Sequence, residues 1–379
     1  MAVSATVVVA GAGLAGLAAA WELSRAGADV VLLDAERRPG GMVVTERPGG
    51  PGEKDGFVVE GGPDGFLAAE PDIQELARDA GIGGRLVDQL ASGSSLWTGQ
   101  RLEPLAEGQA AALLGIQIPS DVRAQHEDVG AQHAAPLQFG FRSFATGMLD
   151  LVEALVARLA PVFRPAQGVT GLAPATRGWR LSLNGGSTVE AEAVILALPA
   201  WAAARLVTGA GVPAARHLDD VIYYPSTTVS LAYRSDQLAA APAGTGFVST
   251  AEWGESGAAV RACSYSWLKY PGRAPPGHAL IRAFVGPVDG DPAAAAHAEL
   301  AGILGIRGSP LWSRAFTWPR GLPRYTPGHA GHVAAVRERL TRLAPLAIAG
   351  AGFDGAGVSA CVKSGREAAR EILHRLGQV

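Results

Sequence analysis

The residues best suited to chemistry lie near the start of the chain. They are three spaced glycines, Gly11, Gly13 and Gly16, and one acidic residue, Asp34. The apolar run 6–10 before the triplet has the composition of a buried strand, and residues 17–25 have that of a helix. The first glycine permits a tight turn, the second lets a pyrophosphate approach the backbone, and the third lets the helix pack on the strand. Asp34 comes at the end of a second apolar run, and its carboxylate can accept hydrogen bonds from ribose hydroxyls. The pattern predicts dinucleotide binding at this turn, with Leu14 and Ala15 at the helix start.

A second glycine-rich turn follows the acid. The residues there that we expect to contact the cofactor are Ala35, Arg37, Gly40, Gly41 and Met42. This extension resembles the motif of flavoproteins of the amine oxidase and protoporphyrinogen oxidase superfamily, in which the paired glycines lie near the diphosphate. Most members have a basic residue where this chain has Met42. The resemblance implies FAD rather than NAD, bound noncovalently because no His or Cys lies in a recognised flavin-linking motif.

Four later stretches resemble one branch of that superfamily. Residues 56–67 resemble the GPDSF segment of protoporphyrinogen and coproporphyrinogen III oxidases, with Gly65 in place of the serine. Residues 269–275, 322–329 and 349–365 resemble the family's aromatic-Pro-x-Arg-Ala-Pro stretch, its Leu-Pro-x-Tyr-x-x-Gly-His stretch and its carboxy-terminal flavin motif. On these ordered matches the chain is identified as a member of that family. The first match implies cofactor contacts at Gly62, Pro63 and Asp64.

The last match also carries a physical argument of its own. A short apolar strand, 346–350, leads through a glycine-dense loop to a predicted helix over 358–373, so backbone N–H groups at the helix start point at a ligand. The alternative is a strand-to-helix connection without a ligand. By resemblance, the loop holds the ribityl chain and the pyrimidine edge of the flavin, and Val169 lies against the adenine. The remaining cofactor contacts expected from the resemblance are Trp318, Gly350, Ala351, Gly357, Val358 and Ser359.

The chain departs from the family in two places. Between Leu105 and Phe139 it has a short polar segment, where family members carry a helical module that covers the substrate and docks on the membrane. The polar residues of this segment include His126, Glu127, Asp128 and His133. Ser94 and Ser95 stand where family members often place an arginine that holds a substrate propionate. We therefore expect weak porphyrinogen oxidation and no stable membrane association.

Candidate substrate contacts come from the family pattern. Tyr270 stands where the family has a stacking aromatic residue and Val248 where it has an aliphatic clamp, although both suit core packing equally well. We expect Lys269 to contact either the flavin or a carboxylate. Either Arg101 or Arg142 is expected to replace the missing arginine that holds a substrate propionate. The alternative for these basic side chains is plain exposure to solvent. No catalytic residue is assigned, because the flavin itself takes the hydride.

Composition excludes several other classes of protein. With 32 basic and 35 acidic side chains, the net charge of −3 leaves no basic field for nucleic acid. Two cysteines, Cys263 and Cys361, argue against a disulfide scaffold and favour a reducing cytoplasm. The pair His329 and His332 lacks a metal-site motif, so we expect no metal. No apolar run is long enough for a transmembrane helix.

The order of strand and helix patterns predicts an α/β fold. We expect a Rossmann-like FAD domain from residues 1–85, 165–199 and 311–379, a β-rich substrate domain over 200–310, and a truncated lid segment over 86–164. Three functions stay open: an FAD-dependent oxidase of the porphyrinogen type, an oxidase of an amine or a secondary metabolite, and an FAD-binding partner protein without turnover. The expected partner is a small-molecule substrate, and the oligomeric state stays open.

Overall fold

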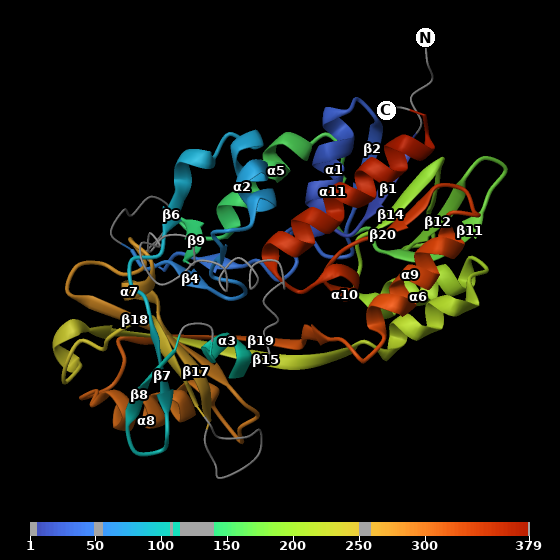
Figure 1. Ribbon diagram of the computed structural model, residues 1–379. Helices are drawn as coiled ribbons and strands as arrows, with labels where there is room; N and C mark the ends of the chain where they lie inside the picture. The colour runs from blue at the N-terminus through green and yellow to red at the C-terminus, as the bar shows by residue number, and fades with distance from the viewer. Residues whose placement is uncertain (1–5, 49–55, 107–108, 114–139, 250–258, 378–379) are drawn as a thin grey trace, which may run out of the picture.

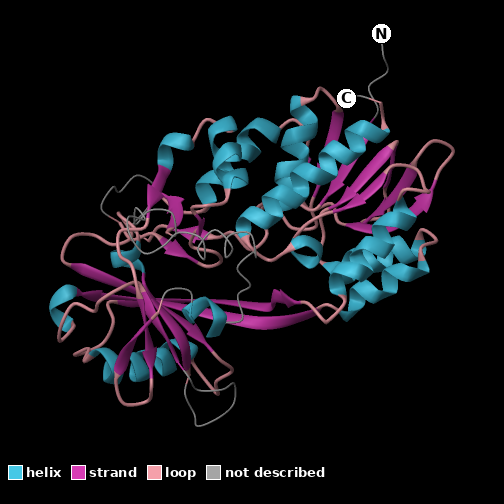
Figure 2. Ribbon diagram, viewed as in Figure 1, coloured by secondary structure: helices cyan, strands magenta, loops and turns pink. Residues whose placement is uncertain are grey.

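The computed structural model describes residues 6–48, 56–106, 109–113, 140–249 and 259–377. It shows two lobes (Figure 1). One lobe, which we call the mixed lobe, has a sheet between helices, and the other, the sheet lobe, consists mostly of strands (Figure 2). This arrangement confirms the predicted α/β class with a β-rich part. The polar residues His126, Glu127, Asp128 and His133 lie outside the described residues.

A parallel sheet forms the centre of the mixed lobe. Within the described residues its strand order is β10-β2-β1-β14-β20, with bounds Phe163–Arg164, Asp29–Leu33, Thr6–Ala10, Ala193–Leu196 and Leu346–Ile348. β1 pairs in parallel with both β2 and β14. β14 and β20 consist of apolar residues alone, and β1 does so from Val7 onward, because both faces of the sheet are covered there.

Alternate residues of β1 enter two different cores. Val7 and Val9 pack in the core that contains residues of four helices, which are α1 (Leu14–Arg25), α2 (Pro71–Asp79), α5 (Leu149–Leu159) and α11 (Val358–Arg375). Val8 and Ala10 pack in the core on the other side, formed with β11 (Val169–Pro174), β12 (Trp179–Leu183), β13 (Thr188–Ala191), α6 (Ala200–Gly209), the 3-10 helix η3 (Pro213–Asp220) and α9 (His329–Leu340). The predicted first and last helices are thus present.

The sheet lobe is a largely antiparallel sheet. Its order within the described residues is β19-β15-β18-β17-β16-β7-β8, with bounds Trp312–Arg324, Ile222–Arg234, His278–Val285, Val260–Tyr265, Gly246–Ser249, Ser94–Trp97 and Leu102–Leu105. Helix α8 (Pro292–Leu304) covers one face, where Ile281 and Ala283 of β18 are buried. Because side chains alternate along a strand, Arg282 points to the opposite face. The long strands β15 and β19 run toward α6 and α9 of the mixed lobe (Figure 1).

Residues 86–164 are divided between the lobes in their described parts. Strands β7 and β8 extend the sheet lobe, whereas α5 packs in the core of the mixed lobe. The remaining elements are short: β3 (Thr45–Glu46), β4 (Val59–Glu60), β5 (Phe66–Leu67), η1 (Gly83–Arg85), β6 (Leu86–Asp88), α3 (Gln109–Leu113), β9 (Phe141–Phe144), η4 (Ser235–Gln237), α7 (Ser266–Lys269) and α10 (Ala351–Asp354). Strands β5, β9 and β6 form a small sheet beside α2.

Candidate flavin site

The first glycine turn is shaped by contacts with backbone. A Cβ added to Gly11, whose φ is +102°, would lie 2.3 Å from the carbonyl oxygen of Ala197. A Cβ added to Gly16 would lie 1.8 Å from the carbonyl oxygen of Gly11, so α1 packs directly on the turn. At Gly13, by contrast, an added Cβ meets no protein atom within 4 Å. Gly13 also precedes α1 without a capping side chain, which leaves N–H groups at the helix start for an anion.

Asp34 follows β2 beside this turn. Its carboxylate accepts hydrogen bonds from the amides of Ala12, at 2.6 Å, and Glu36, at 2.7 Å. The amide of Gln167 donates to the main-chain carbonyl of Asp34 at 2.6 Å, and Val169 follows two residues later. The structure therefore brings together Asp34 and Val169, the two residues expected at the nucleotide end of the cofactor.

The second glycine turn folds back onto the first. A Cβ added to Gly41 would lie 3.4 Å from Cα of Gly13. Arg38 holds this turn through hydrogen bonds from its guanidinium to the carbonyls of Pro39, Gly41 and Val43. Burial lowers the pKa of Arg38, against the opposing charges of Asp34 and Glu36. The sequence prediction named Arg37 and not its neighbour Arg38; both side chains are exposed, and Arg38 makes the hydrogen bonds to this turn.

The loop Gly61–Asp64 is held by side chains from several strands. Gly62 packs on the second turn, because a Cβ added there would lie 1.8 Å from the carbonyl oxygen of Met42. Three carbonyls of the loop accept hydrogen bonds: that of Gly61 from Trp318 Nε1 at 2.8 Å, that of Gly62 from Arg282, and that of Asp64 from Ser143 Oγ at 2.8 Å. The predicted cofactor residues Met42, Gly62, Asp64 and Trp318 thus lie together.

The carboxy-terminal loop is also held by side chains. Ser364 Oγ accepts from the amide of Gly350 at 2.8 Å and donates to Asp354 at 2.6 Å. Arg337 binds the carboxylate of Asp354 at 2.6 and 2.8 Å, and Tyr325 donates to the carbonyl of Ala351 at 2.6 Å. A Cβ added to Gly350 would lie 3.5 Å from that of Ala15, so this loop adjoins the start of α1.

These residues fit a flavin nucleotide. An added Cβ would meet no atom within 4 Å at Gly13, and only Ala360, at 3.9 Å, at Gly357, so both positions leave room for a ligand. Ser359, in the first turn of α11, has a buried Oγ with no hydrogen-bond partner in the described part of the chain. A flavin bound here would supply a hydride acceptor. The chain itself would bind and orient it through the two glycine turns and the two helix starts.

Lys269 and Tyr270 lie close to the Gly61–Asp64 loop. Lys269 Nζ donates to the carboxylate of Asp64 at 2.9 and 3.1 Å. Tyr270 is only 1% exposed, and the cationic groups of Lys269 and Arg273 lie 5.2 and 5.3 Å from the centre of its ring. Burial raises the pKa of Tyr270, and the charge of Asp64 adds to the effect. The ring expected to stack on substrate is therefore enclosed by protein.

The structure does not bring the other candidate substrate contacts to this loop. Val248 is buried in β16, where it pairs with Leu96 and Ala262 of the neighbouring strands. Arg101 lies between β7 and β8, with its side chain 78% exposed and paired with Glu103 at 2.7 Å.

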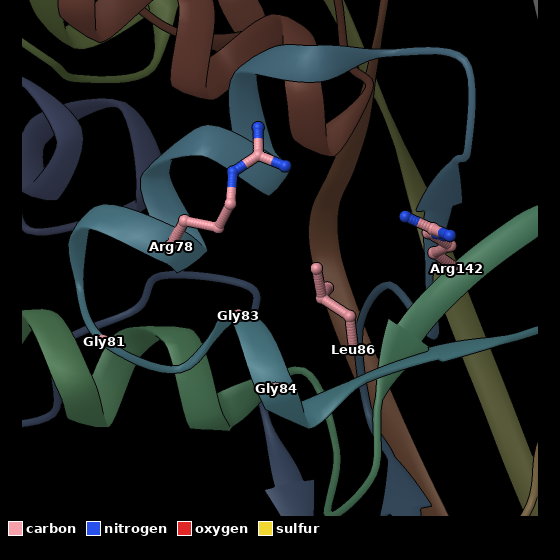
Figure 3. Close-up of a pocket in the computed structure, with 6 residues that line it drawn as sticks. All are labelled: Arg78, Gly81, Gly83, Gly84, Leu86 and Arg142. Atoms are coloured by element: carbon pink, nitrogen blue, oxygen red, sulfur yellow. The ribbon is translucent and has the colours of Figure 1, made fainter.

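Arg142 lines a surface hollow beside α2 (Figure 3). The lining residues are Arg78, Gly81, Gly83, Gly84, Leu86 and Arg142. The guanidinium of Arg142 donates to Asp88 and to Gln74, both at 2.6 Å. Its neighbour on β9, Ser143, points to the opposite face and contacts Arg273. Arg142 is therefore directed away from Lys269 and Asp64.

Three buried charged residues close to the Gly61–Asp64 loop were not predicted from the sequence: Glu60, Arg273 and Arg282. Arg273 Nη2 lies 3.6 Å from Glu60 Oε1 and donates to Ser143 at 2.6 Å. A signal was available for Arg282, because it is the one charged residue inside the apolar run 279–285. A charge at the centre of such a strand is rarely placed there without a partner.

Comparisons with known proteins agree with this geometry. The family model of flavin containing amine oxidoreductases matches residues 83–373, and that of an NAD(P)-binding Rossmann-like domain matches residues 9–80. The chain belongs to the flavin containing amine oxidoreductase family. Like other members of this enzyme family, it is a flavin-dependent oxidoreductase.

Relatives of this amine oxidoreductase include the coproporphyrinogen III oxidase of Bacillus subtilis, 24% identical with 97% of each chain covered. That of Propionibacterium freudenreichii is 26% identical, with 97% of this chain and 90% of the relative covered. The first alignment spans 470 residues, so the chain, with 379, is the shorter of the two.

Solved structures share the fold. A protein assigned as a protoporphyrinogen oxidase from Exiguobacterium has a TM-score of 0.79 and 23% identity, with both chains fully covered. Cyclohexylamine oxidase from Brevibacterium oxydans has a TM-score of 0.75 and 14% identity, with 99% of this chain and all of that one covered.

Two features are absent from the described residues. None of the helices described there is long and apolar enough to cross a membrane. The same residues contain no group of three or more His, Cys, Asp or Glu side chains arranged to hold a metal ion.

Proposed function

We propose that this amine oxidoreductase binds FAD noncovalently and dehydrogenates an electron-rich small molecule of the porphyrinogen type, with oxygen as the electron acceptor. The observation that carries the proposal is the convergence of distant glycine segments. Gly41 adjoins Gly13, Gly62 adjoins Met42, and Gly350 adjoins Ala15. The relatives named coproporphyrinogen III oxidase support the substrate class, because they match nearly the whole chain.

The state of the cysteines supports noncovalent binding. Cys263 is buried in the core of the sheet lobe, and Cys361 lies in the first turn of α11. Burial raises the pKa of the Cys361 thiol to about 12, and the nearby charge of Asp354 adds to this effect. A thiol with so high a pKa forms little thiolate near neutral pH, so it is a poor nucleophile toward the flavin. Both cysteines are free, which also supports the proposal of a reducing cytoplasm.

The substrate contacts stay proposals at Tyr270, Val248, Lys269 and Arg101. A second candidate function, oxidation of an amine or a secondary metabolite, is favoured by one observation. The ring of Tyr270 is enclosed, so it would have to move before a tetrapyrrole could stack on it. We therefore expect porphyrinogen oxidation to be weak. The division into an FAD domain, a substrate domain and a truncated lid also stays a proposal.

Flavin content tests the cofactor. Gly13→Val places a side chain where no protein atom stands but where the pyrophosphate must approach, so the variant is expected to fold and to lose FAD. Gly302→Val in α8 is the matched control, because a Cβ there also meets no atom. Absorbance at the flavin band, with FAD released by heat and identified by chromatography, gives the stoichiometry. Full FAD content in Gly13→Val would contradict the proposed turn.

Substrate oxidation is tested separately. Porphyrin fluorescence is followed after oxygen is admitted to anaerobic coproporphyrinogen III or protoporphyrinogen IX, with correction for spontaneous oxidation. A slow, protein-dependent rise is expected. No rise, together with anaerobic bleaching of the flavin by an amine, would replace the porphyrinogen proposal by the second candidate.

A further inference from the structure

We propose that a buried set of charges between the lobes makes the bound flavin easier to reduce, and that Arg282 is the positioning residue that carries this effect. The set, which we call the interlobe charge cluster, consists of Glu60, Asp64, Lys269, Arg273 and Arg282. The inference rests on the proposed binding of FAD and adds to it a function for residues outside the glycine turns.

The cluster joins the sheet lobe to the Gly61–Asp64 loop. Lys269 Nζ lies 2.9 Å from a carboxylate oxygen of Asp64, and Arg273 Nη2 lies 3.6 Å from one of Glu60. Arg282 donates from β18 to the carbonyl of Gly62. Arg273 is 1% exposed, and Glu60 and Arg282 are each 4% exposed. Solvent therefore screens these three charges weakly, whereas the side chains of Lys269 and Asp64 are 13% and 21% exposed.

The cluster carries more positive than negative charge. Its three cationic side chains face two carboxylates, and both guanidinium groups stay protonated. Burial works to raise the pKa of Asp64, but the charges of Lys269 and Arg282 outweigh it and lower the pKa to about 2. Burial raises the pKa of Glu60, against the charge of Arg273. The net charge is thus at least one positive unit near neutral pH.

Two donors of the cluster lack an acceptor in the described part of the chain. They are Arg273 Nη1 and Arg282 Nε, and both atoms are buried. A buried charge without full compensation is costly, so a negative charge placed nearby lowers the energy of the whole site.

The path from this cluster to the cofactor turns is continuous. Arg282 holds Gly62, Gly62 packs on Met42, and the adjacent Gly41 packs on Gly13. We place the flavin ring against the Gly61–Asp64 loop, where Gly62, Pro63 and Asp64 are expected cofactor contacts, and leave the diphosphate to the glycine turns beyond it. The ring gains two electrons when it takes a hydride, and cations close to it stabilise the negative charge that this adds. The cluster therefore favours the reduced over the oxidised flavin.

The equilibrium between oxidised and reduced flavin tests this directly. We expect Arg282→Met to lower the equilibrium constant for reduction about tenfold, which is ~30 mV for a two-electron couple, and Arg282→Lys to restore most of it. Asp64→Asn removes a negative charge from the same cluster, so its potential should shift in the opposite direction. Arg314→Met on β19 is the matched control, because Arg314 is exposed and paired with Glu46 outside the cluster.

The midpoint potential is measured against reference dyes on the flavin-loaded proteins. For a variant purified without flavin, the ratio of its dissociation constants for reduced and oxidised FAD gives the same quantity. Opposite shifts in Arg282→Met and Asp64→Asn support the inference, because a purely structural role would not reverse sign. The inference would be overturned by unchanged potentials, by shifts of the same sign in Arg282→Met and Asp64→Asn, or by a shift that Arg282→Lys does not reverse. A raised KM for the substrate at constant potential would also overturn it. Failure of the wild type to bind any flavin would instead contradict the proposed function.

Discussion

The two ends of the chain each contribute a glycine turn to the same site, and the two turns are fixed by different forces. In the first turn, Gly11 and Gly16 have backbone atoms where a side chain would begin. In the carboxy-terminal turn, Gly350 is held by Ser364, which is held by Asp354, which is held by Arg337. One turn depends on the absence of side chains and the other on their presence. We therefore expect the two turns to respond to substitution in different ways.

The largest effect is expected at the first turn. Gly16→Val requires an atom 1.8 Å from the carbonyl oxygen of Gly11, and only movement of α1 away from β1 can relieve that overlap. We expect a loss of more than about 4 kcal/mol in the free energy of unfolding, or no folded protein. Urea denaturation of the purified variant, with Gly302→Val as the reference, checks this. A loss similar to that of the reference would show that the backbone contact does not fix the turn.

A smaller effect is expected at the carboxy-terminal turn. Asp354→Asn weakens the hydrogen bonds from Arg337 and Ser364 without adding an atom. We expect a loss of about 1–3 kcal/mol, together with weaker flavin binding, because Gly350 loses its support. The control is Glu338→Gln on α9, which removes an exposed ion pair with Arg342 just after the helix and should cost under about 1 kcal/mol. Equal losses in the two variants would contradict the distinction between the turns.

The Gly61–Asp64 loop, which packs on the second glycine turn, makes the stability of the fold depend on pH. The folded protein lowers the pKa of Asp64 from 3.8 to about 2, so this carboxylate stabilises the fold above about pH 4 and loses that effect as the pH falls toward 2. The contribution is about 2 kcal/mol. Lys269→Gln removes the nearest cation, so its stability should fall less steeply between pH 4 and pH 2. Parallel pH profiles for the variant and the wild type, from chemical denaturation, would refute the assignment.

The smallest effect is expected at the β7–β8 hairpin, far from both turns. Arg101→Ala breaks an ion pair with Glu103 whose side chains are largely exposed, so the free energy of unfolding should change by less than about 1 kcal/mol. Any rise in KM for the substrate then reports binding rather than folding. An unchanged KM would remove Arg101 from the proposed substrate contacts.

The contrast between the two turns also explains which parts of the structure could be predicted from the sequence. The strand 6–10, the helix after it and the spacing of the first glycines are local features, so their geometry was predictable. The support of Gly350 comes from α9 and from inside α11, and no spacing rule connects Arg337 to that loop. Asp64 and Lys269 of the interlobe charge cluster were named from the family pattern. Glu60, Arg273 and Arg282 were not, because Glu60 and the two arginines come together only through the packing of one lobe on the other. The candidate Tyr270 matched a family motif, but its enclosure depends on Arg273 and Lys269 in three dimensions.

Gly65 lies where the backbone after the Gly61–Asp64 loop meets Tyr270 and leaves no room for a side chain. A Cβ at this position would lie 2.1 Å from the hydroxyl oxygen of Tyr270 and 2.5 Å from the carbonyl oxygen of Arg142. The GPDSF segment that this stretch resembles has a serine here, and a serine Cβ would overlap both the Tyr270 hydroxyl and the backbone of Arg142. Restoring serine at 65 therefore requires movement of the β9 backbone as well as of Tyr270. A single Gly65→Ser substitution is expected to be deleterious, and moving the tyrosine side chain alone would not make it tolerated.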